Sequence, residues 1–302
     1  MPYPIYTIIS YDEIEQLGTK EKFWFYDEDN TKKLFKIGRA NTGEDWAEKV
    51  AYELAELLDI PCAIYEFAKW YDKKGTISIS FISDGARLIH GNELLVDFYD
   101  DEYPDSQKYH LKDYKLNVVL DLIESLDDLK LPVNNLGIDI DRPIKLFIGY
   151  LIFDCWIANQ DRHHENWGFI ESFDDTSLAP TYDHAAGFGC KVSAIEAKKR
   201  LETKDKNYSV KKFVTKAKSP FYNESGNQLK TIEVIEQLAQ RDIDSVCYWI
   251  DKIVSISMDK IQSIFDEIPN EFIEENSKKF AQAILYENRL RLLELKKEIC
   301  DV

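Results

Sequence analysis

The sequence predicts an α+β protein with two lobes, a small β-rich N-terminal lobe that carries one helix and a larger, mostly α-helical C-terminal lobe. Two strand–turn–strand patterns and a single amphipathic stretch occupy the first 83 residues. After residue 111 the apolar residues recur instead at helical spacing. The pattern changes near residues 84–96, and we expect the lobes to comprise residues 1–90 and 91–302. A chain of 302 residues is long enough to build both cores.

Two hairpins and one helix are expected in the N-terminal lobe. Asp- and Asn-rich or Gly-containing turns separate runs of aromatic and β-branched residues. Ile77 and Ile79 alternate with Ser78, which is the period of a half-buried strand. The helix is expected over residues 44–58, where two acids open a run with helical apolar spacing. The four expected strands are residues 22–26, 33–37, 62–71 and 76–83.

The C-terminal lobe is expected to be built from helices and long loops. Residues 97–112 are acidic, aromatic and irregular, which indicates a surface loop. Residues 185–228 are rich in Lys and Ser and short of apolar periodicity, so we expect a long loop with a short helix near residues 210–214. Residues 167–170 are strand-like. The expected helices are residues 113–130, 141–158, 228–240, 243–254, 258–266 and 271–299.

The composition is that of an ordinary soluble globular protein, with 44% hydrophobic and 31% charged residues. The net charge of −17 argues against binding nucleic acid directly or lying on anionic lipid, because both require a local excess of Lys and Arg. The N-terminal residues do not resemble a signal peptide, and the longest apolar run, residues 144–158, is too short for a membrane span. The five scattered cysteines contain no CxxC pair, so we expect free thiols and a cytoplasmic location.

Three polar residues follow or flank the buried run that ends near residue 158. Asp161 and Asn166 have D-x-x-x-x-N spacing, and Asp183 comes after the next strand-like segment. In phosphoryl transfer, an Asp accepts the proton of the attacking hydroxyl and nearby oxygen ligands hold magnesium. Asp161 is therefore the candidate catalytic base, and Asn166 and Asp183 are candidate metal ligands. The same residue types also form ordinary loops, and the spacing alone does not separate the two interpretations.

Lys36 lies inside an expected strand, where an unpaired buried ammonium group is costly. Glu48 of the following helix is the preferred partner, because it lies on a face of small residues that can approach a sheet. Glu53 is the competing partner. A strand Lys held by a helix Glu and directed at nucleotide phosphates is the arrangement that kinases use. The alternative is an edge-strand Lys36 whose side chain reaches water.

Gly18, Thr19, Lys20 and Lys22 lie at the entrance to the first hairpin. A glycine that opens a turn can direct backbone N–H groups at phosphates. The segment matches neither the Walker A pattern nor GxGxxG, and a plain turn that leads into a strand is the competing interpretation.

The histidines permit a rival function, a metal-dependent hydrolase. His163, His164 and His184 lie near Asp161 and Asp183 in the sequence. The chain contains no HExxH motif, and the adjacent His163 and His164 are expected to point in different directions. We expect His163 to buttress the loop at the cofactor site and His184 to pack beside the metal carboxylate.

Taken in their order along the chain, these motifs resemble those of HipA-type serine/threonine kinases. The most specific part is the run Asn159-Gln160-Asp161-Arg162-His163-x-x-Asn166-Trp167-Gly168, followed by Ala179-Pro180-Thr181-Tyr182-Asp183. The resemblance implies a two-lobed fold akin to protein kinases and phosphatidylinositol 3/4-kinases. It also implies an ATP- and Mg²⁺-dependent kinase that phosphorylates a protein hydroxyl.

The resemblance also assigns roles to the matched residues. Asp161 would be the catalytic base, with Asn166 and Asp183 as the magnesium ligands. Lys36, held by Glu48, would bind the ATP phosphates. The phosphate-covering loop would comprise Gly18, Thr19, Lys20 and Lys22, and the adenine would contact Phe81, Ile82 and Ser83. His163 would belong to the cofactor site. Residues 184–228 would take the place of an activation loop.

Two departures and several alternatives remain. Full-length HipA kinases carry an additional N-terminal subdomain, whereas only seventeen residues precede Gly18, so we expect a compact member of the family. HipA contacts DNA together with its antitoxin, but the charge of this chain gives no support for direct DNA binding. A toxin role with an antitoxin partner, or an effector role, is what the family suggests. A nucleotide-binding pseudokinase and a lipid-kinase-like enzyme are the alternatives.

Overall fold

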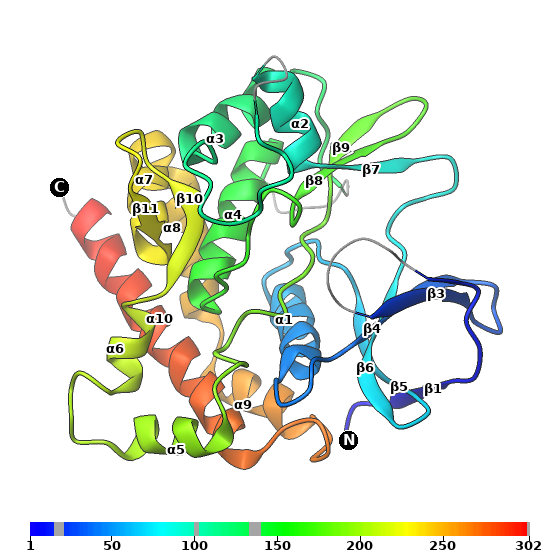
Figure 1. Ribbon diagram of the computed structural model, residues 1–302. Helices are drawn as coiled ribbons and strands as arrows, with labels where there is room; N and C mark the ends of the chain where they lie inside the picture. The colour runs from blue at the N-terminus through cyan, green and yellow to red at the C-terminus, as the bar shows by residue number, and fades with distance from the viewer. Residues whose placement is uncertain (15–20, 100–102, 133–139, 301–302) are drawn as a thin grey trace.

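The computed structural model describes residues 1–14, 21–99, 103–132 and 140–300. A six-stranded sheet forms the N-terminal part, and helices dominate the C-terminal part (Figure 1). The predicted α+β fold with a β-rich N-terminal lobe is therefore confirmed. Gly18, Thr19 and Lys20 lie outside the described residues.

The N-terminal sheet is built around the two predicted hairpins. Its strand order is β1-β5-β6-β4-β3-β2, and all neighbours are antiparallel except β1 and β5. Aromatic and β-branched residues on one face, including Phe23, Phe35 and Ile77, form a small core of their own. The strands are β1 (Ile5–Ile8), β2 (Glu13–Ile14), β3 (Lys22–Tyr26), β4 (Lys32–Ile37), β5 (Tyr65–Trp70) and β6 (Lys73–Ile79).

The turn of the second hairpin differs from the prediction. The sequence predicts a turn over residues 72–75, but β6 already begins at Lys73 and the turn is confined to Tyr71 and Asp72. Gly75 pairs with Ala68 on one side and Ile37 on the other. A Cβ atom at Gly75 would lie 2.1 Å from the carbonyl oxygen of Lys36. The glycine therefore permits close strand approach inside the sheet, where the pattern indicated a turn.

Helix α1 (Glu44–Leu57) lies between the N-terminal sheet and the helical part (Figure 1). It packs against β5 and β6 of the sheet and against α9 of the helical part. Ala47, Ala51 and Ala55 are fully buried, and these small side chains allow close approach of the helix to the sheet. The predicted helix over residues 44–58 is confirmed to within one residue.

Helix α4 (Pro143–Trp156) is the centre of the helical part. It is apolar on nearly all sides and packs against α3, α7, α8 and α10. Pro143 takes the first helical position, where a missing N–H costs nothing. The other helices of this group are α3 (Leu116–Ser125), α7 (Thr231–Arg241), α8 (Ile243–Ser255), α9 (Met258–Asp266) and α10 (Glu275–Cys300).

A three-stranded sheet adjoins this helical group. Its order is β7-β8-β9, comprising Arg87–His90, Gly168–Glu171 and Thr176–Leu178. The strand expected over residues 167–170 corresponds to β8. The sequence predicted neither β7 nor the helix α2 (Gly91–Phe98), because their apolar runs are short.

Residues 185–228 contain more regular structure than predicted. The short helix α6 (Val210–Val214) is where it was expected, but α5 (Ala194–Glu202) was predicted to be loop. The Ser193 side chain caps α5, and the helix buries only Ala194 and Ala197, so it has little apolar periodicity to detect. Strands β10 (Lys218–Tyr222) and β11 (Gln228–Lys230) form a further pair. The helix expected from residue 228 therefore begins at Thr231.

The expectation of five free cysteines is wrong for one pair. The structure joins Cys247 of α8 to Cys300 of α10 as a disulfide, while Cys62, Cys155 and Cys190 are free. The two partners are 53 residues apart, and only the packing of α8 on α10 brings them together. Within the described ranges, no helix is both long and apolar enough to cross a bilayer.

Candidate active site

The loop after α4 is organised by a buried ion pair between Asp154 and Arg162. Asp154 lies in the last turn of α4, and Ala158 ends the helical segment with a left-handed φ of 55°. The Arg162 Nε donates to Asp154 Oδ2 at 2.7 Å, and Nη2 donates to Oδ1 at 2.9 Å. The side chains are only 2% and 6% exposed. Burial alone would lower the pKa of Arg162, but the Asp154 carboxylate outweighs burial and raises that pKa.

The same guanidinium group connects two further segments. Its Nη1 donates to the carbonyl oxygens of Asn166 at 2.5 Å and Tyr182 at 3.2 Å. Its Nη2 lies 3.0 Å from Nε2 of His184. Arg162 therefore fixes the backbone at Asn166 and immediately before Asp183, which are the two candidate metal ligands.

Asp161 is held at the surface of this loop. Its backbone N–H donates to the Asn159 side chain at 3.2 Å, and Asn159 in turn donates to Asp154 at 2.8 Å. The Asp161 side chain is 27% exposed, so an incoming hydroxyl group can reach it. In this structure Oδ1 of Asp161 accepts a hydrogen bond from the hydroxyl of Tyr109 at 2.9 Å. The Tyr109 hydroxyl therefore occupies the place beside the Asp161 carboxylate where the hydroxyl group of a substrate would bind if Asp161 is the base.

Asn166 and Asp183 offer the oxygen atoms that magnesium prefers. The Asn166 amide nitrogen donates to the Asp161 carbonyl at 2.7 Å, which directs the amide oxygen away from that carbonyl. Asp183 has a left-handed φ of 57°, a conformation that Asp tolerates better than most residues. Its backbone N–H donates to the Tyr65 hydroxyl at 3.2 Å. Asp183 would supply a carboxylate oxygen and Asn166 an amide oxygen, which are the donor types that suit a magnesium ion completed by phosphate oxygens and water.

Lys36 of β4 reaches both candidate regions. Its Nζ lies 3.7 Å from Glu48 Oε1 and 3.8 Å from Asp183 Oδ2. Glu48 is 2% exposed, and its other oxygen accepts the backbone N–H of His184 at 2.9 Å. Glu53, the competing partner, pairs with Lys49 instead at 2.7 Å.

The charge state of Lys36 follows from these neighbours. Burial alone would lower the pKa of Lys36, but the Asp183 and Glu48 carboxylates outweigh it and raise the pKa above the usual value. The ammonium group therefore stays charged at neutral pH.

Other predicted cofactor residues lie around Lys36. Lys22 of β3 is the cross-strand partner of Lys36, which places two cations side by side on the sheet. Phe81 stacks on Tyr182 with 5.7 Å between ring centroids, so the segment 81–83 lies beside the residue that precedes Asp183. The backbone N–H of Ile82 donates to the Ser80 hydroxyl at 3.3 Å, whereas Ser83 is exposed.

The histidines have structural partners. His163 Nδ1 accepts the backbone N–H of Glu165 at 3.2 Å, and its Nε2 lies 3.9 Å from Asp161 Oδ1. His184 is fully buried beside Arg162, and burial holds its pKa well below the usual value. Burial likewise lowers the pKa of His164 to about 4. Among the residues that the structure describes, no group of three or more His, Cys, Asp or Glu side chains is placed to hold a metal ion.

Several residues of the site were not assigned by sequence reasoning. Arg162 belongs to the quoted motif but received no role, and Tyr65 and Tyr109 were not singled out. The signal for Asp154 was present, because a single acid in a dense apolar run requires a buried cation. Tyr65 and Tyr109 carry no comparable signal.

A β-rich lobe with a Lys–Glu pair, placed against a helical lobe that presents Asp161, Asn166 and Asp183, defines a kinase-like fold. The sequence model of the HipA-like C-terminal domain matches residues 16–246, and the chain belongs to this family. Comparison with curated protein sequences gives no significant match.

Solved structures agree with this fold. The Helicobacter pylori proinflammatory kinase CtkA superposes with a TM-score of 0.80 at 20% sequence identity, covering 99% of each chain. HipA of Shewanella oneidensis, solved with HipB and operator DNA, superposes with a TM-score of 0.60 at 12% identity. That match covers 98% of this chain and 68% of HipA. At such identities the similarity establishes the fold.

Proposed function

We propose that this protein is an ATP- and Mg²⁺-dependent serine/threonine protein kinase. The observation that carries the proposal is the position of the Lys36 ammonium group, within 4 Å of both Glu48 and Asp183. These residues come from β4, α1 and the segment after β9, which are far apart in the sequence. A cation held at the junction of the two lobes, beside a candidate metal ligand, is suited to nucleotide phosphates.

The proposed reaction transfers the γ-phosphoryl group of ATP to a protein hydroxyl. The acceptor oxygen bonds to the γ-phosphorus while the bond to the β,γ-bridging oxygen breaks and ADP leaves. Asp161 orients the acceptor hydroxyl and takes its proton. Asn166 and Asp183 would hold magnesium, which when bound neutralises negative charge on the phosphate oxygens.

The nucleotide is proposed to bind between residues 1–90 and residues 91–302. Lys22 and Lys36 are directly opposed on neighbouring strands, an arrangement that a bound polyphosphate would stabilise. We assign Gly18, Thr19 and Lys20 to the phosphate-covering loop. The adenine is assigned to residues 81–83, and His163 to the loop that supports Asp161 at the cofactor site.

Two relatives guide the proposed biological role. The HipA structure is named as a toxin–antitoxin complex, and CtkA is named as a proinflammatory kinase. We therefore propose a cytoplasmic kinase that acts as a toxin with an antitoxin protein as partner, or as an effector. Its substrate is a protein, and the net charge of −17 supports a role without direct nucleic-acid or membrane binding.

The direct test is to incubate the purified chain with γ-labelled ATP, MgCl₂ and a mixture of protein substrates. We expect labelled phosphoserine or phosphothreonine after acid hydrolysis, and no label when EDTA removes the metal. ATP binding without transfer to any protein would identify a pseudokinase. Transfer to phosphoinositides in place of proteins would identify a lipid kinase, and either result would overturn the proposal.

A further inference from the structure

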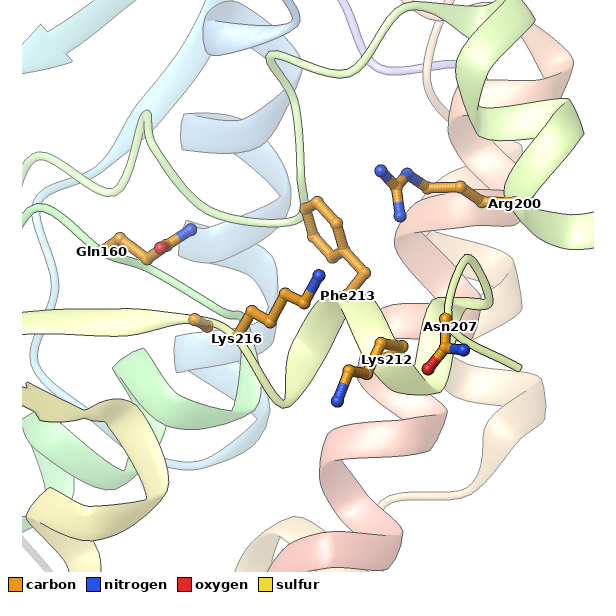
Figure 2. A pocket seen from close by; sticks show the side chains of 7 residues that line it. Gln160, Arg200, Asn207, Lys212, Phe213 and Lys216 are labelled. Carbon is orange, nitrogen blue, oxygen red and sulfur yellow. The ribbon is translucent and has the colours of Figure 1, made fainter. Parts of the chain in front are cut away.

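A basic pocket opens beside the candidate catalytic loop (Figure 2). Its volume is about 190 Å³, which is room for about six water molecules at the density of liquid water. Residues of α5, α6 and the connections around them form most of its wall. The side chains that matter here are Gln160, Arg200, Asn207, Lys212, Phe213 and Lys216.

The positive charge of this basic pocket exceeds its negative charge. Arg200 pairs with Glu196 at 3.0 Å and lies over the rings of Tyr208 and Phe213, at 4.4 and 5.2 Å from their centroids. These contacts hold the guanidinium group in place, yet its buried Nε has no hydrogen-bond partner in the described part of the chain.

Lys212 and Lys216 add further positive charge to the wall of the pocket. Neither Lys212 nor Lys216 forms an ion pair with any acid in the ranges that the structure describes. Three cations therefore line this space, and among the described residues only Arg200 of the three pairs with an acid, Glu196. Such a concentration of positive charge stands out in a protein with a net charge of −17, and it attracts anions.

Gln160 connects the basic pocket to the catalytic loop. Its Oε1 accepts the backbone N–H of Lys218 at 3.1 Å, so the amide oxygen is occupied by that bond. The amide nitrogen consequently points toward the pocket, as Figure 2 shows. Gln160 immediately precedes Asp161, and one residue of extended peptide spans about 3.5 Å. A group bound here therefore lies within a few peptide residues of the acceptor hydroxyl.

We propose that the basic pocket is a substrate subsite that binds an anionic side chain close to the phosphorylated Ser or Thr. The ligand chemistry is a phosphoryl group or a carboxylate carried by the protein substrate. A phosphoryl group fits best, because it brings nearly two negative charges and three acceptor oxygens to the donors of Arg200, Lys212 and Lys216. The proposal rests on the kinase function and specifies the substrate class.

Binding can be tested without catalysis. Fluorescent degenerate peptides with a central Ser and one fixed flanking residue, either phosphoserine, Glu, Ala or Lys, are titrated with the phosphatase-treated protein in the absence of ATP. At one flanking position we expect phosphoserine to bind at least fivefold more tightly than Ala, with Glu intermediate and Lys weakest. Inorganic phosphate should compete with the phosphoserine peptide.

A double substitution and a matched control locate the effect. Lys212→Gln with Lys216→Gln should reduce the preference for phosphoserine to less than twofold. Lys198→Gln with Lys211→Gln removes the same charge from exposed positions of α5 and α6 outside the pocket, and should retain the preference. Equal binding of the phosphoserine and Ala peptides, or a preference that survives the first double variant, would refute the subsite.

A kinetic measurement separates this proposal from the kinase assignment. With the peptides as substrates, the Lys212→Gln, Lys216→Gln variant should raise KM for the phosphoserine peptide at least fivefold and leave kcat for the Ala peptide within twofold. If no peptide is phosphorylated but the anion preference is present in the binding experiment, the kinase function fails and the anion site stands. If peptides are phosphorylated without any anion preference, the subsite fails and the kinase function stands.

Discussion

At the residue scale, the Arg162 guanidinium group links the candidate catalytic loop to the segment that carries the candidate metal ligand Asp183. It contacts Asp154, the carbonyl oxygens of Asn166 and Tyr182, and His184, all in the interior. A buried ion pair of this kind does little for net stability compared with an apolar pair, but removal of one partner leaves an uncompensated charge. The pair therefore fixes geometry and makes the site sensitive to single substitutions.

Asp154→Asn tests this link. The substitution leaves Arg162 buried without its counter-ion, so we expect the free energy of unfolding to fall by about 3–5 kcal/mol in urea titrations. Asp251→Asn is the control, because it removes an exposed partner of Lys296 and should cost less than about 1 kcal/mol. Similar small losses for both variants would contradict the role of Arg162.

Tyr109 gives a second residue-scale prediction. Its hydroxyl donates to Asp161 Oδ1 and must leave before a substrate hydroxyl can take that place. Tyr109→Phe should raise kcat/KM about two- to tenfold, the equivalent of one hydrogen bond of about 0.5–1.5 kcal/mol. Tyr71→Phe, at an exposed tyrosine far from Asp161 in the sequence, is the control and should change nothing. A fall in kcat/KM for Tyr109→Phe would instead mean that the hydroxyl assists the reaction.

At the scale of elements, the first turn of α1 carries Asp45, whose carboxylate is buried and costly to ionise. Burial raises the pKa of Asp45 to about 6, although the backbone N–H of Trp46 donates to its carboxylate at 2.8 Å. Above pH 6 the folded protein must hold this carboxylate ionised in a desolvated site. Ionisation thus weakens folding as the pH rises from about 4 to 6.

Asp45→Asn should therefore stabilise the protein at neutral pH. The gain is up to about 3 kcal/mol above pH 6 and should fall below about 1 kcal/mol near pH 4, where Asp45 is protonated in the folded state and roughly half protonated in the unfolded state. Melting temperatures of the two proteins measured from pH 4 to 8 give the difference. A difference that does not change with pH would show that the charge of Asp45 is not its cause.

Elements were predictable where their local signals agree. The first hairpin has turn residues between apolar runs, and α1 has acids in its first turn and helical apolar spacing, so the local signals of each element agree. Gly75 led to a wrong turn prediction because a glycine can serve a turn or a close strand contact, and only the position of Lys36 on the neighbouring strand decides. Helix α5 escaped detection because alanines, which carry little hydrophobic signal, form its buried face.

At the scale of the whole molecule, the candidate site depends on contacts between the two lobes. Lys36 and Asp183 are distant in the sequence. They meet because α1 packs against β5 and β6 of the sheet and also against α9 of the helical part. The backbone groups of Ala63 and Thr181 are hydrogen-bonded at 2.9 Å, which anchors the segment before Asp183 to the N-terminal part. The candidate residues Lys36, Asp161 and Asp183 could be identified from the sequence. The contacts of Tyr65 and Tyr109 could not, because they depend on this packing.

The central claim is that Asp161 and Asp183 carry phosphoryl transfer, and the initial rate of transfer from γ-labelled ATP tests it most directly. Asp161→Asn and Asp183→Asn should each lower the rate by at least about 100-fold while the proteins keep their melting temperature within a few degrees. Asp174→Asn, at an exposed position on the turn between β8 and β9, should retain the wild-type rate within twofold. Undiminished transfer by the Asp161 and Asp183 variants would contradict the account.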